Sequence, residues 1–349
     1  MDYAEHVEKL PYVLGKPEGV GILKQQSEFF KVNEQLSFEP SNEGEHEFLL
    51  IEKTQLNSED VVKLLSQYAG LPRRAISFAG MKDKQAVTTQ WFSLHLPGKA
   101  GPDWTQLEHP GIQVKKATRH NKKLKKGAIK CNQFEITLSK LVVDRASIER
   151  RIELIKQAGV PNYFMTQRFG YQGQNLTRAY TFFLNKQTIK NRKMKGFLLS
   201  SARSYLFNLV LAQRVKQKNW HTGLVGDAFI LDGTRQFFYN EVLSEDIANR
   251  LLTHDIHPSG PLYGIGEHPV SASVKQLEEQ IFNDNAVLCD GLRAAKVESA
   301  RRALRVVPSK LKFNWLDEGT LCLSFELASG SYATAVIREL INTAASQLA

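Results

Sequence analysis

The apolar residues of this 349-residue chain follow two spacings, which predict helices in some stretches and strands in others. Val61, Leu65 and Tyr68 recur at helical spacing. Ser58 precedes them as the expected N-cap, and Gly70 follows as the expected end of the helix. Further helices are expected around residues 148–155 before Gly159, over 197–218, as a pair within 274–304 separated by Asp290-Gly291, and over 334–348.

Strands are predicted where apolar and polar residues alternate, or where short apolar runs are bounded by turn residues. The alternation is clearest at Phe92, Leu94 and Leu96, at the end of a β-rich stretch. The expected strands are 48–51, 76–79, 87–96, 112–114, 134–138, 228–231 and 321–327. Strand patterns dominate both chain ends and helical patterns the middle, so the sequence predicts an α+β core from both ends with a more helical insertion between them.

The charge distribution indicates a polyanionic partner. The chain has 46 Lys and Arg against 36 Asp and Glu, a formal net charge of +10. Residues 115–130 contain eight basic side chains and no acidic one, and a second basic cluster spans 186–195. Such runs suit binding to phosphates, with affinity that falls as salt rises, although a solvated loop is the alternative for either run.

Several classes of chemistry lack their sequence motifs. The chain has no G-x-x-x-x-G-K-[ST] loop, no G-x-G-x-x-G after a strand and no H-E-x-x-H. His254 and His257 lack an obvious third ligand, and the three cysteines are widely spaced. We therefore expect no nucleotide cofactor and no metal. The acidic first ten residues do not resemble a signal peptide and no stretch is apolar enough to span a membrane, so we expect a cytoplasmic protein. A monomer is expected as well.

The most suggestive polar cluster is the loop 80–85 between two predicted strands. Asp83 lies at its tip between Lys82 and Lys84, which we expect to favour the ionised carboxylate. A carboxylate held between strands can act as a nucleophile or a base. The alternative is an Asp in a polar turn, which is the commoner use of this residue.

The stretch 78–92, with Ala-Gly-Met-Lys-Asp-Lys followed by Ala-Val-Thr and Gln-Trp, resembles the catalytic motif of the TruD-type pseudouridine synthases, the tRNA pseudouridine synthase D family. Other blocks match in the same order: Lys24 with 27–34, 44–46, 130–134, 159–170, 201–208, 331–334 and 338–340. Together the blocks span nearly the whole chain. The sequence is therefore similar to full-length bacterial members of this family.

The resemblance implies a pseudouridine synthase core of mixed or antiparallel sheet and helices, formed by residues 1–157 and 307–349, with an α/β TRUD domain inserted at 158–306. It implies isomerisation of uridine to pseudouridine in tRNA, at position 13, without cofactor or metal. Asp83 corresponds to the catalytic aspartate, which would attack a flipped-out uridine at ribose C1′ or at C6 of the ring.

The resemblance also assigns substrate-binding positions. Lys24 would pair with Asp83, the aromatic residues Phe30, Phe134 and Tyr332 would line the uridine pocket, and Asn132 would bind the uracil edge. Among basic residues, the expected contacts to the RNA backbone are Arg119, Lys122, Lys123, Lys125, Lys126 and Lys193.

Two residues depart from the family pattern: Tyr332 replaces the usual Phe, and Met165 replaces a Gly, which puts the local turn in question. The motif around Asn162, Tyr163 and Arg168 is interpreted as structural first, with RNA contact by Arg168 as the alternative.

Two other functions stay open from the residues alone. A noncatalytic tRNA-binding or RNA-chaperone protein would use the same basic surface, with Asp83 as a turn residue. An RNA methyltransferase dependent on S-adenosylmethionine has less support, because the chain has no glycine-rich cofactor loop.

Overall fold

The computed structural model describes residues 3, 5–186 and 189–343, and the chain divides into two compact units. The unit that we call the sheet unit comprises Glu18–Ile148, Pro308–Gly330 and the segment from Ile341. The other, the helical unit, comprises Met1–Pro17, Glu149–Val307 and Ser331–Leu340. The helical unit therefore combines the middle of the chain with two segments near the chain ends, Met1–Pro17 and Ser331–Leu340. The expected domain boundaries near residues 157 and 307 stay predictions.

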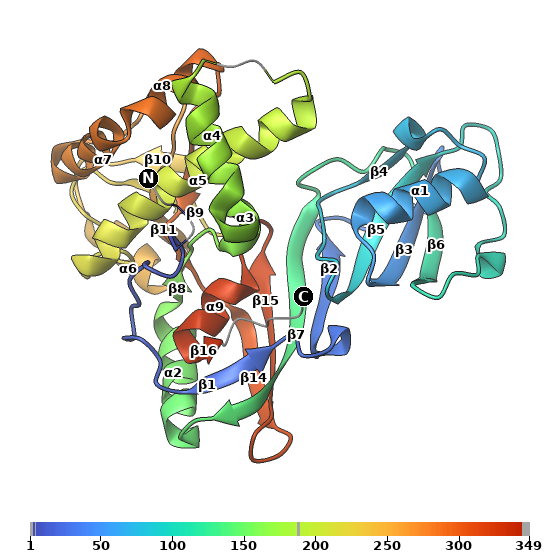
Figure 1. The fold of residues 1–349 in the computed structure, drawn as a ribbon, viewed down its shortest axis with the longest axis horizontal. Helices are drawn as coiled ribbons and strands as arrows, with labels where there is room; N and C mark the ends of the chain where they lie inside the picture. The colour runs from blue at the N-terminus through green and yellow to red at the C-terminus, as the bar shows by residue number, and fades with distance from the viewer. Residues whose placement is uncertain (1–2, 4, 187–188, 344–349) are drawn as a thin grey trace. The chain divides into compact units, whose positions relative to one another are not determined.

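The sheet unit is built on a mixed sheet with the strand order β14-β15-β7-β2-β5-β3-β6 (Figure 1). Along this path β2 and β5 run parallel and the other neighbours antiparallel. Off the path, β4 pairs with β5, and β1 pairs with β7 and β16. The strands are β1 (Val20–Leu23), β2 (Phe30–Leu36), β3 (His46–Thr54), β4 (Ile76–Phe78), β5 (Val87–His95), β6 (Ile112–His120), β7 (Ile129–Val142), β14 (Ser309–Trp315), β15 (Leu321–Ala328) and β16 (Asn342–Thr343).

The strands expected in this unit from alternation are all present, and most are longer than predicted. No apolar pattern predicted β1 or β2. In β2 the alternation begins with Phe30 and Val32 but continues inward with Glu34, which is 2% exposed. A buried carboxylate at a core-facing position interrupts the period-2 pattern, so a central strand does not stand out in the sequence.

Helix α1 (Ser58–Tyr68) packs its apolar side on β3 and β5. The expected cap at Ser58 is wrong, because Asn57 is the N-cap: its side chain accepts hydrogen bonds from the main-chain N–H groups of Glu59 (2.9 Å) and Asp60 (3.1 Å). The Asp60 carboxylate accepts in return from the Asn57 N–H, which completes a capping box. Ser58 is the first helical residue, and its hydroxyl is free to bind elsewhere.

We expect Asn57→Ala to lower the free energy of unfolding by about 1 kcal/mol, because the substitution removes the acceptor of two main-chain N–H groups. Urea unfolding followed by circular dichroism measures this. Gln67→Ala, at an exposed position of the same helix, is the control and should change stability by less than ~0.5 kcal/mol. Equal effects of the two substitutions would contradict the capping role.

The helical unit surrounds the long helix α5 (Arg192–Lys216). Its small sheet has the strand order β10-β9-β11-β12, and β13 pairs with β8. The remaining helices are α2 (Arg145–Ala158, which carries the chain into this unit), α3 (Thr166–Phe169), α4 (Gln174–Leu184), α6 (Glu245–Leu252), α7 (Ala272–Asp284), α8 (Ala286–Ala294) and α9 (Ala333–Leu340). The strands are β8 (Val160–Pro161), β9 (Ala228–Leu231), β10 (Phe237–Tyr239), β11 (Ile256–Leu262), β12 (Ala300–Ala303) and β13 (Arg305–Val306).

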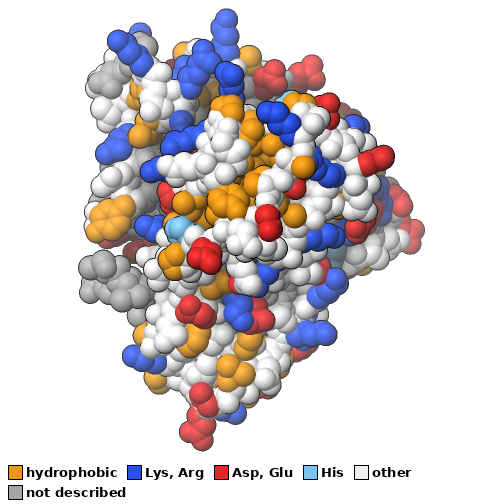
Figure 2. All heavy atoms as spheres, turned by 90° about the vertical axis from the view of Figure 1, so that its right-hand side faces the viewer, with side chains coloured by type: hydrophobic (Ala, Val, Ile, Leu, Met, Phe, Trp, Pro, Cys, Tyr) orange, Lys and Arg blue, Asp and Glu red, His pale blue; other side chains and the backbone are white. Residues whose placement is uncertain are grey.

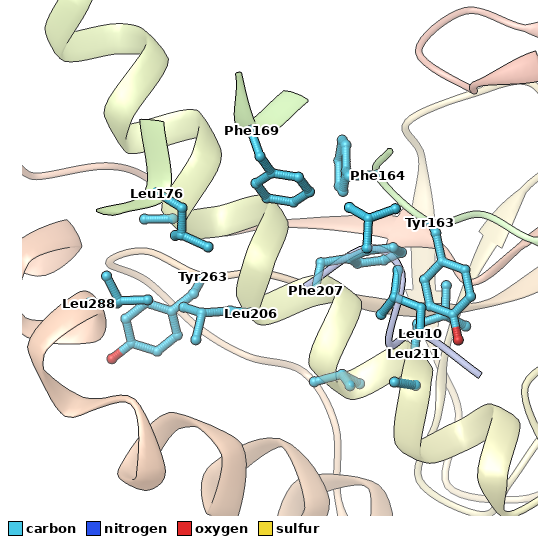
Figure 3. Close-up of a cluster of buried hydrophobic side chains, with 14 of the residues drawn as sticks. Leu10, Tyr163, Phe164, Phe169, Leu176, Leu206, Phe207, Leu211, Tyr263 and Leu288 are labelled. Carbon is cyan, nitrogen blue, oxygen red and sulfur yellow. The ribbon is translucent and has the colours of Figure 1, made fainter. Parts of the chain in front are cut away.

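The core of the helical unit forms along α5. Leu206, Phe207 and Leu211 of this helix are fully buried beside Phe164 and Tyr263 (Figure 3). Each such side chain contributes about 1.5–3 kcal/mol by leaving water. Among the described residues, no helix is both long and apolar enough to cross a bilayer.

Two helix predictions for this part of the sequence need correction. The break between α7 and α8 lies at Asn285, and Gly291 is inside α8, where a Cβ would lie 2.1 Å from the ring of Phe183. That glycine therefore serves close packing between helices and does not mark a turn. Residues 300–303 form β12 instead of continuing a helix.

The closing helix also ends earlier than expected. α9 stops at Leu340, and the chain then forms β16, which pairs parallel with β1. Residues 344–348 of the predicted helix lie outside the described residues.

Candidate active site

Strand register places a row of polar side chains on one face of the main sheet. Lys53 of β3 is paired with Thr88 of β5, which is paired with Val32 of β2. Two residues further along β2, Glu34 is paired with Asn132 of β7. Because paired residues share a face and the period is two, these side chains lie on the face that α1 also covers.

The loop between β4 and β5 brings Asp83 to this face. The Lys24 ammonium forms an ion pair with Oδ2 of Asp83, and Oδ1 accepts a hydrogen bond from the main-chain N–H of Gln85 (3.1 Å). Burial acts to raise the pKa of the Asp83 carboxyl, but Lys24, the Gln85 N–H and Lys53 outweigh it and hold the pKa below its usual value. The carboxylate is thus ionised at neutral pH, and one third of the side chain stays exposed.

Lys24 follows directly after β1 and reaches Asp83 from an unusual backbone conformation. Its φ is 60°, in the left-handed region that residues other than glycine rarely adopt. Its ammonium also lies 4.3 Å from the centre of the Phe30 ring, in a cation–π contact. The ion pair and the aromatic contact offset the cost of this backbone geometry.

The expected role of the flanking lysines in ionising Asp83 is wrong. Lys82 points away to Glu34 of β2, with Nζ 2.6 Å from Oε2, and both side chains are buried. Burial raises the pKa of Glu34, and the opposing effect of Lys82 lowers it only in part. Lys84 is exposed. The charges that stabilise the Asp83 carboxylate come from Lys24 and Lys53, which are distant in sequence.

The structure brings three of the predicted substrate-binding residues together on β2 and β7. Phe30 and Phe134 are in edge contact, with ring centroids 6.2 Å apart, and Phe134 stacks on Phe325 of β15. Asn132 shares their face, and its buried Oδ1 has no hydrogen-bond partner among the described residues. A buried amide oxygen without a partner is costly unless a bound molecule supplies a donor.

Tyr332 belongs to the helical unit. Its hydroxyl accepts a hydrogen bond from Nε of Arg168 (2.9 Å), whose Nη1 also donates to the hydroxyl of Ser200 (2.9 Å). The extra hydroxyl that distinguishes Tyr332 from Phe therefore has a partner. Met165, the other departure, has φ −98°, which any residue adopts, so the local turn does not require glycine.

Asn162 and Arg168 both serve packing within the helical unit. The Asn162 side chain accepts from Arg302 and donates to the Ala303 carbonyl (3.0 Å). The Arg168 carbonyl accepts from the Ser201 hydroxyl (3.0 Å). These contacts support the structural interpretation of the motif.

The basic segment 115–130 is partly strand and partly loop. Residues up to His120 belong to β6, and the exposed Lys122, Lys123, Lys125 and Lys126 lie in the following loop. The loop is anchored by the buried side chain of Leu124. It also packs on Gly44, where a Cβ would lie 2.5 Å from the Cα of Asn121.

The remaining predicted backbone contacts lie elsewhere. Arg119 in β6 donates to the carbonyl of Lys99 (2.7 Å), and Lys193 lies in the first turn of α5, in the other unit. Figure 2 shows basic side chains on the face it presents, spread among acidic and apolar ones.

Sequence reasoning missed three residues that hold the Asp83 loop. The Ser58 hydroxyl accepts from the Lys82 N–H (3.1 Å) and donates to Gln90 (2.7 Å), which in turn donates to the Gly80 carbonyl. Lys53 donates to the carbonyl of Asp83 (2.9 Å). The available signal was a lysine two residues beyond Ile51, just past the predicted strand 48–51, at a position that continues the core-facing side of that strand.

Within the described residues, no group of three or more His, Cys, Asp and Glu side chains is placed to hold a metal ion. His257, one of the two histidines considered from the sequence, is held by Asp232 (2.8 Å) and Arg305 (3.0 Å). The three cysteines are free.

Comparisons with known proteins identify the family of this chain. The family model for tRNA pseudouridine synthase D (TruD) matches residues 6–191 and 184–340. The chain is 42% identical over 332 residues to the tRNA pseudouridine synthase D of Methylococcus capsulatus, covering 95% of this chain and 94% of that protein. It is 41% identical over 336 residues to that of Nitrosococcus oceani, covering 96% and 94%.

Among solved structures, the fold matches the crystal structure of a protein from Methanosarcina mazei assigned as tRNA pseudouridine synthase D (TruD), with a TM-score of 0.71, 20% identity and 97% coverage of both chains. This likeness confirms the expected α+β fold. The match of the family model and the identity to curated members along almost the full length give the same answer: the chain belongs to the tRNA pseudouridine synthase D (TruD) family.

Proposed function

We propose that this chain isomerises uridine to pseudouridine in tRNA, at position 13, with Asp83 as the nucleophile. The observation that carries the proposal is the Asp83 carboxylate, ionised by Lys24 and one third exposed on a face of the sheet, in a member of this family. Position 13 comes from the sequence resemblance. A tRNA partner, a monomeric state and a cytoplasmic location stay predictions.

The residues around Asp83 suit a uridine that has left its helix. Phe30 lies beside the Lys24–Asp83 pair and Phe134 packs against it, but both rings are buried, with 5% and 8% exposed. A flipped base would therefore reach these rings only after local opening of the site. The unpartnered Oδ1 of Asn132 is an acceptor for the N3–H of uracil. A base with a donor at this edge would satisfy an atom that is otherwise left without a hydrogen bond.

Two routes are chemically balanced. In the first, an oxygen of Asp83 attacks ribose C1′, the bond from C1′ to N1 breaks, and the freed uracil turns so that its C5 displaces the carboxylate from C1′. In the second, Asp83 adds to C6, the base is transferred from N1 to C5 on the ribose, and the carboxylate leaves C6. In both, C5 loses its proton at the end, and the carboxylate must be ionised to begin and able to leave.

Loss of the C5 proton supplies the test. Purified protein is incubated with a tRNA transcript that carries tritium at C5 of uridine, and the released tritium is counted. We expect about one equivalent per tRNA from a transcript with U13 and none when U13 is replaced by C. No release from any tRNA would overturn the proposed activity, whereas release from both transcripts would overturn only position 13.

The basic loop should contribute to RNA affinity through phosphate contacts. We expect replacement of Lys122, Lys123, Lys125 and Lys126 with Ala to weaken tRNA binding and to reduce the slope of log Kobs against log salt by up to about 3, since each lost phosphate contact changes the slope by ~0.7–0.9. Filter binding between 50 and 300 mM KCl measures the slope.

The control for this experiment removes the same charge elsewhere. Lys16, Lys63, Lys216 and Lys275 are exposed and lie outside both basic clusters. Their replacement with Ala should leave the slope within about 1 of the wild type. Equal slopes for the two quadruple variants would show that the loop 121–128 is only solvated.

A further inference from the structure

Lys53 is a fully buried lysine next to the loop that carries Asp83. Its exposed fraction is 0%, and its ammonium donates to the carbonyl oxygens of Leu56 (2.6 Å) and Asp83 (2.9 Å). A buried ammonium group is unfavourable unless hydrogen bonds and nearby negative charge compensate for lost water. An apolar side chain of similar length would fill this position without that cost, so the charge requires another explanation.

The two carbonyls that Lys53 binds belong to segments that must be fixed for Asp83 to act. Leu56 directly precedes Asn57, the N-cap of α1, so this contact joins β3 to the start of a firmly capped helix. The other carbonyl is that of Asp83 itself. The nucleophile is therefore held twice, by Lys24 at its carboxylate and by Lys53 at its main chain.

We propose that Lys53 is a positioning residue for Asp83: its charged ammonium fixes the main chain of the nucleophile on the sheet and adds to the positive potential that keeps the carboxylate ionised. The inference rests on the proposed function of Asp83. Lys53 is buried and does not contact the substrate in either proposed route. It acts only through Asp83.

The surroundings of Lys53 favour loss of its charge at mildly alkaline pH. Burial lowers the pKa of Lys53 to about 8; Asp83 and Asp60 act to raise it, and Lys82 acts to lower it. Asp83 and Lys82 belong to the loop, and Asp60 belongs to α1. Two further charged residues face this group: Glu34 of β2 pairs with Lys82, and Lys24 pairs with Asp83. As pH rises through about 8, Lys53 loses its charge, and the anchor of the Asp83 carbonyl weakens.

The test compares Lys53→Met and Lys53→Arg with Lys63→Met, which makes the same change at an exposed position of α1. Single-turnover tritium release from the U13 transcript is measured from pH 6.5 to 9, well below the melting temperature of each variant. We expect K53M to lower the rate at pH 7 by roughly 30-fold, because small displacements of a reacting group cost up to ~100-fold, with little change in KM. K63M should match the wild type.

The alkaline side of the pH profile separates positioning from mere stability. The wild-type and K63M rates should fall as pH rises through about 8. The K53R rate should not fall in this way, because Arg keeps its charge, and K53R should recover part of the activity lost in K53M. If K53M does not fold, the K53R profile alone decides.

An alkaline fall that persists in K53R, or a K53M rate within twofold of the wild type, would overturn the inference. Absence of tritium release from the wild type would instead overturn the proposed function, so the two failures are distinguishable.

Discussion

Replacement of Asp83 with Asn should abolish pseudouridine formation, with a loss of at least ~10⁴-fold in the single-turnover rate. The amide has nearly the shape of the carboxylate but is not a nucleophile under these conditions, and it leaves no carboxylate to be expelled. The variant keeps the Asp83 carbonyl that Lys53 binds, so the loop should keep its main-chain anchor. Tritium release from the U13 transcript measures the rate.

Binding of tRNA by D83N should stay within a few fold of the wild type, because the affinity of such proteins for nucleic acid comes mostly from phosphate contacts. Asp246→Asn, at an exposed position in the first turn of α6, makes the same chemical change as a control and should be fully active. Turnover by D83N above 1% of the wild type would refute the assigned nucleophile. If the wild-type chain binds tRNA with the same affinity as D83N but releases no tritium, the noncatalytic RNA-binding alternative would be favoured.

Asp83 could be found from sequence because its signal is local. The motif around it is continuous, and turn residues between two β-rich stretches place it in a loop. Its charge partner is different: Lys24 is 59 residues away. It comes to Asp83 because β1 pairs with β7 just beyond the part of β7 that pairs with β2. A register of this kind is decided by the whole sheet, so only the family resemblance suggested the pair.

The helices and strands show the same difference between local and long-range signals. Helix α1 and strands β5 and β9 were predicted closely, because their spacing and their turn residues lie within the element. The central strand β2 was missed because Glu34 takes a core-facing position. The buried Glu34 pairs with Lys82, a residue of the loop that carries Asp83. The position that obscured the strand therefore belongs to the candidate site.

Lys53 illustrates the limit of such reasoning. A lysine in a strand is ordinarily taken to face solvent, even though alternation with the polar Glu52 and Thr54 places Lys53 on the same face as Ile51. The register of β3 against β5 and β6 turns it inward, beside Thr88, where it meets the Asp83 carbonyl. The structure was needed to show which lysines near the motif act on the carboxylate.

Replacement of Lys24 with Met should lower the rate at pH 7 by about 10²- to 10³-fold, the usual cost of removing a charged donor from a reacting group. Burial raises the pKa of Asp83, and Lys24 is the strongest influence that opposes it. Without Lys24 the pKa of Asp83 should rise, so more of the carboxyl is protonated as pH falls. The rate of K24M should therefore decline from neutral towards acidic pH, where the wild-type rate stays constant. Tritium release between pH 5 and 8 measures both profiles.

The control for this prediction is Lys31→Met, which breaks the exposed pair of Lys31 and Glu135 on the same sheet and should change the rate by less than about twofold. Lys24→Arg keeps the charge and should restore the wild-type pH profile, even if the different side-chain shape lowers the rate. An acidic limb that is the same in K24M and the wild type would show that Lys24 does not ionise Asp83. In that case the main function of Lys24 would be its contact with Phe30. The lower rate of K24M would then reflect poorer packing of Phe30 against the uracil base.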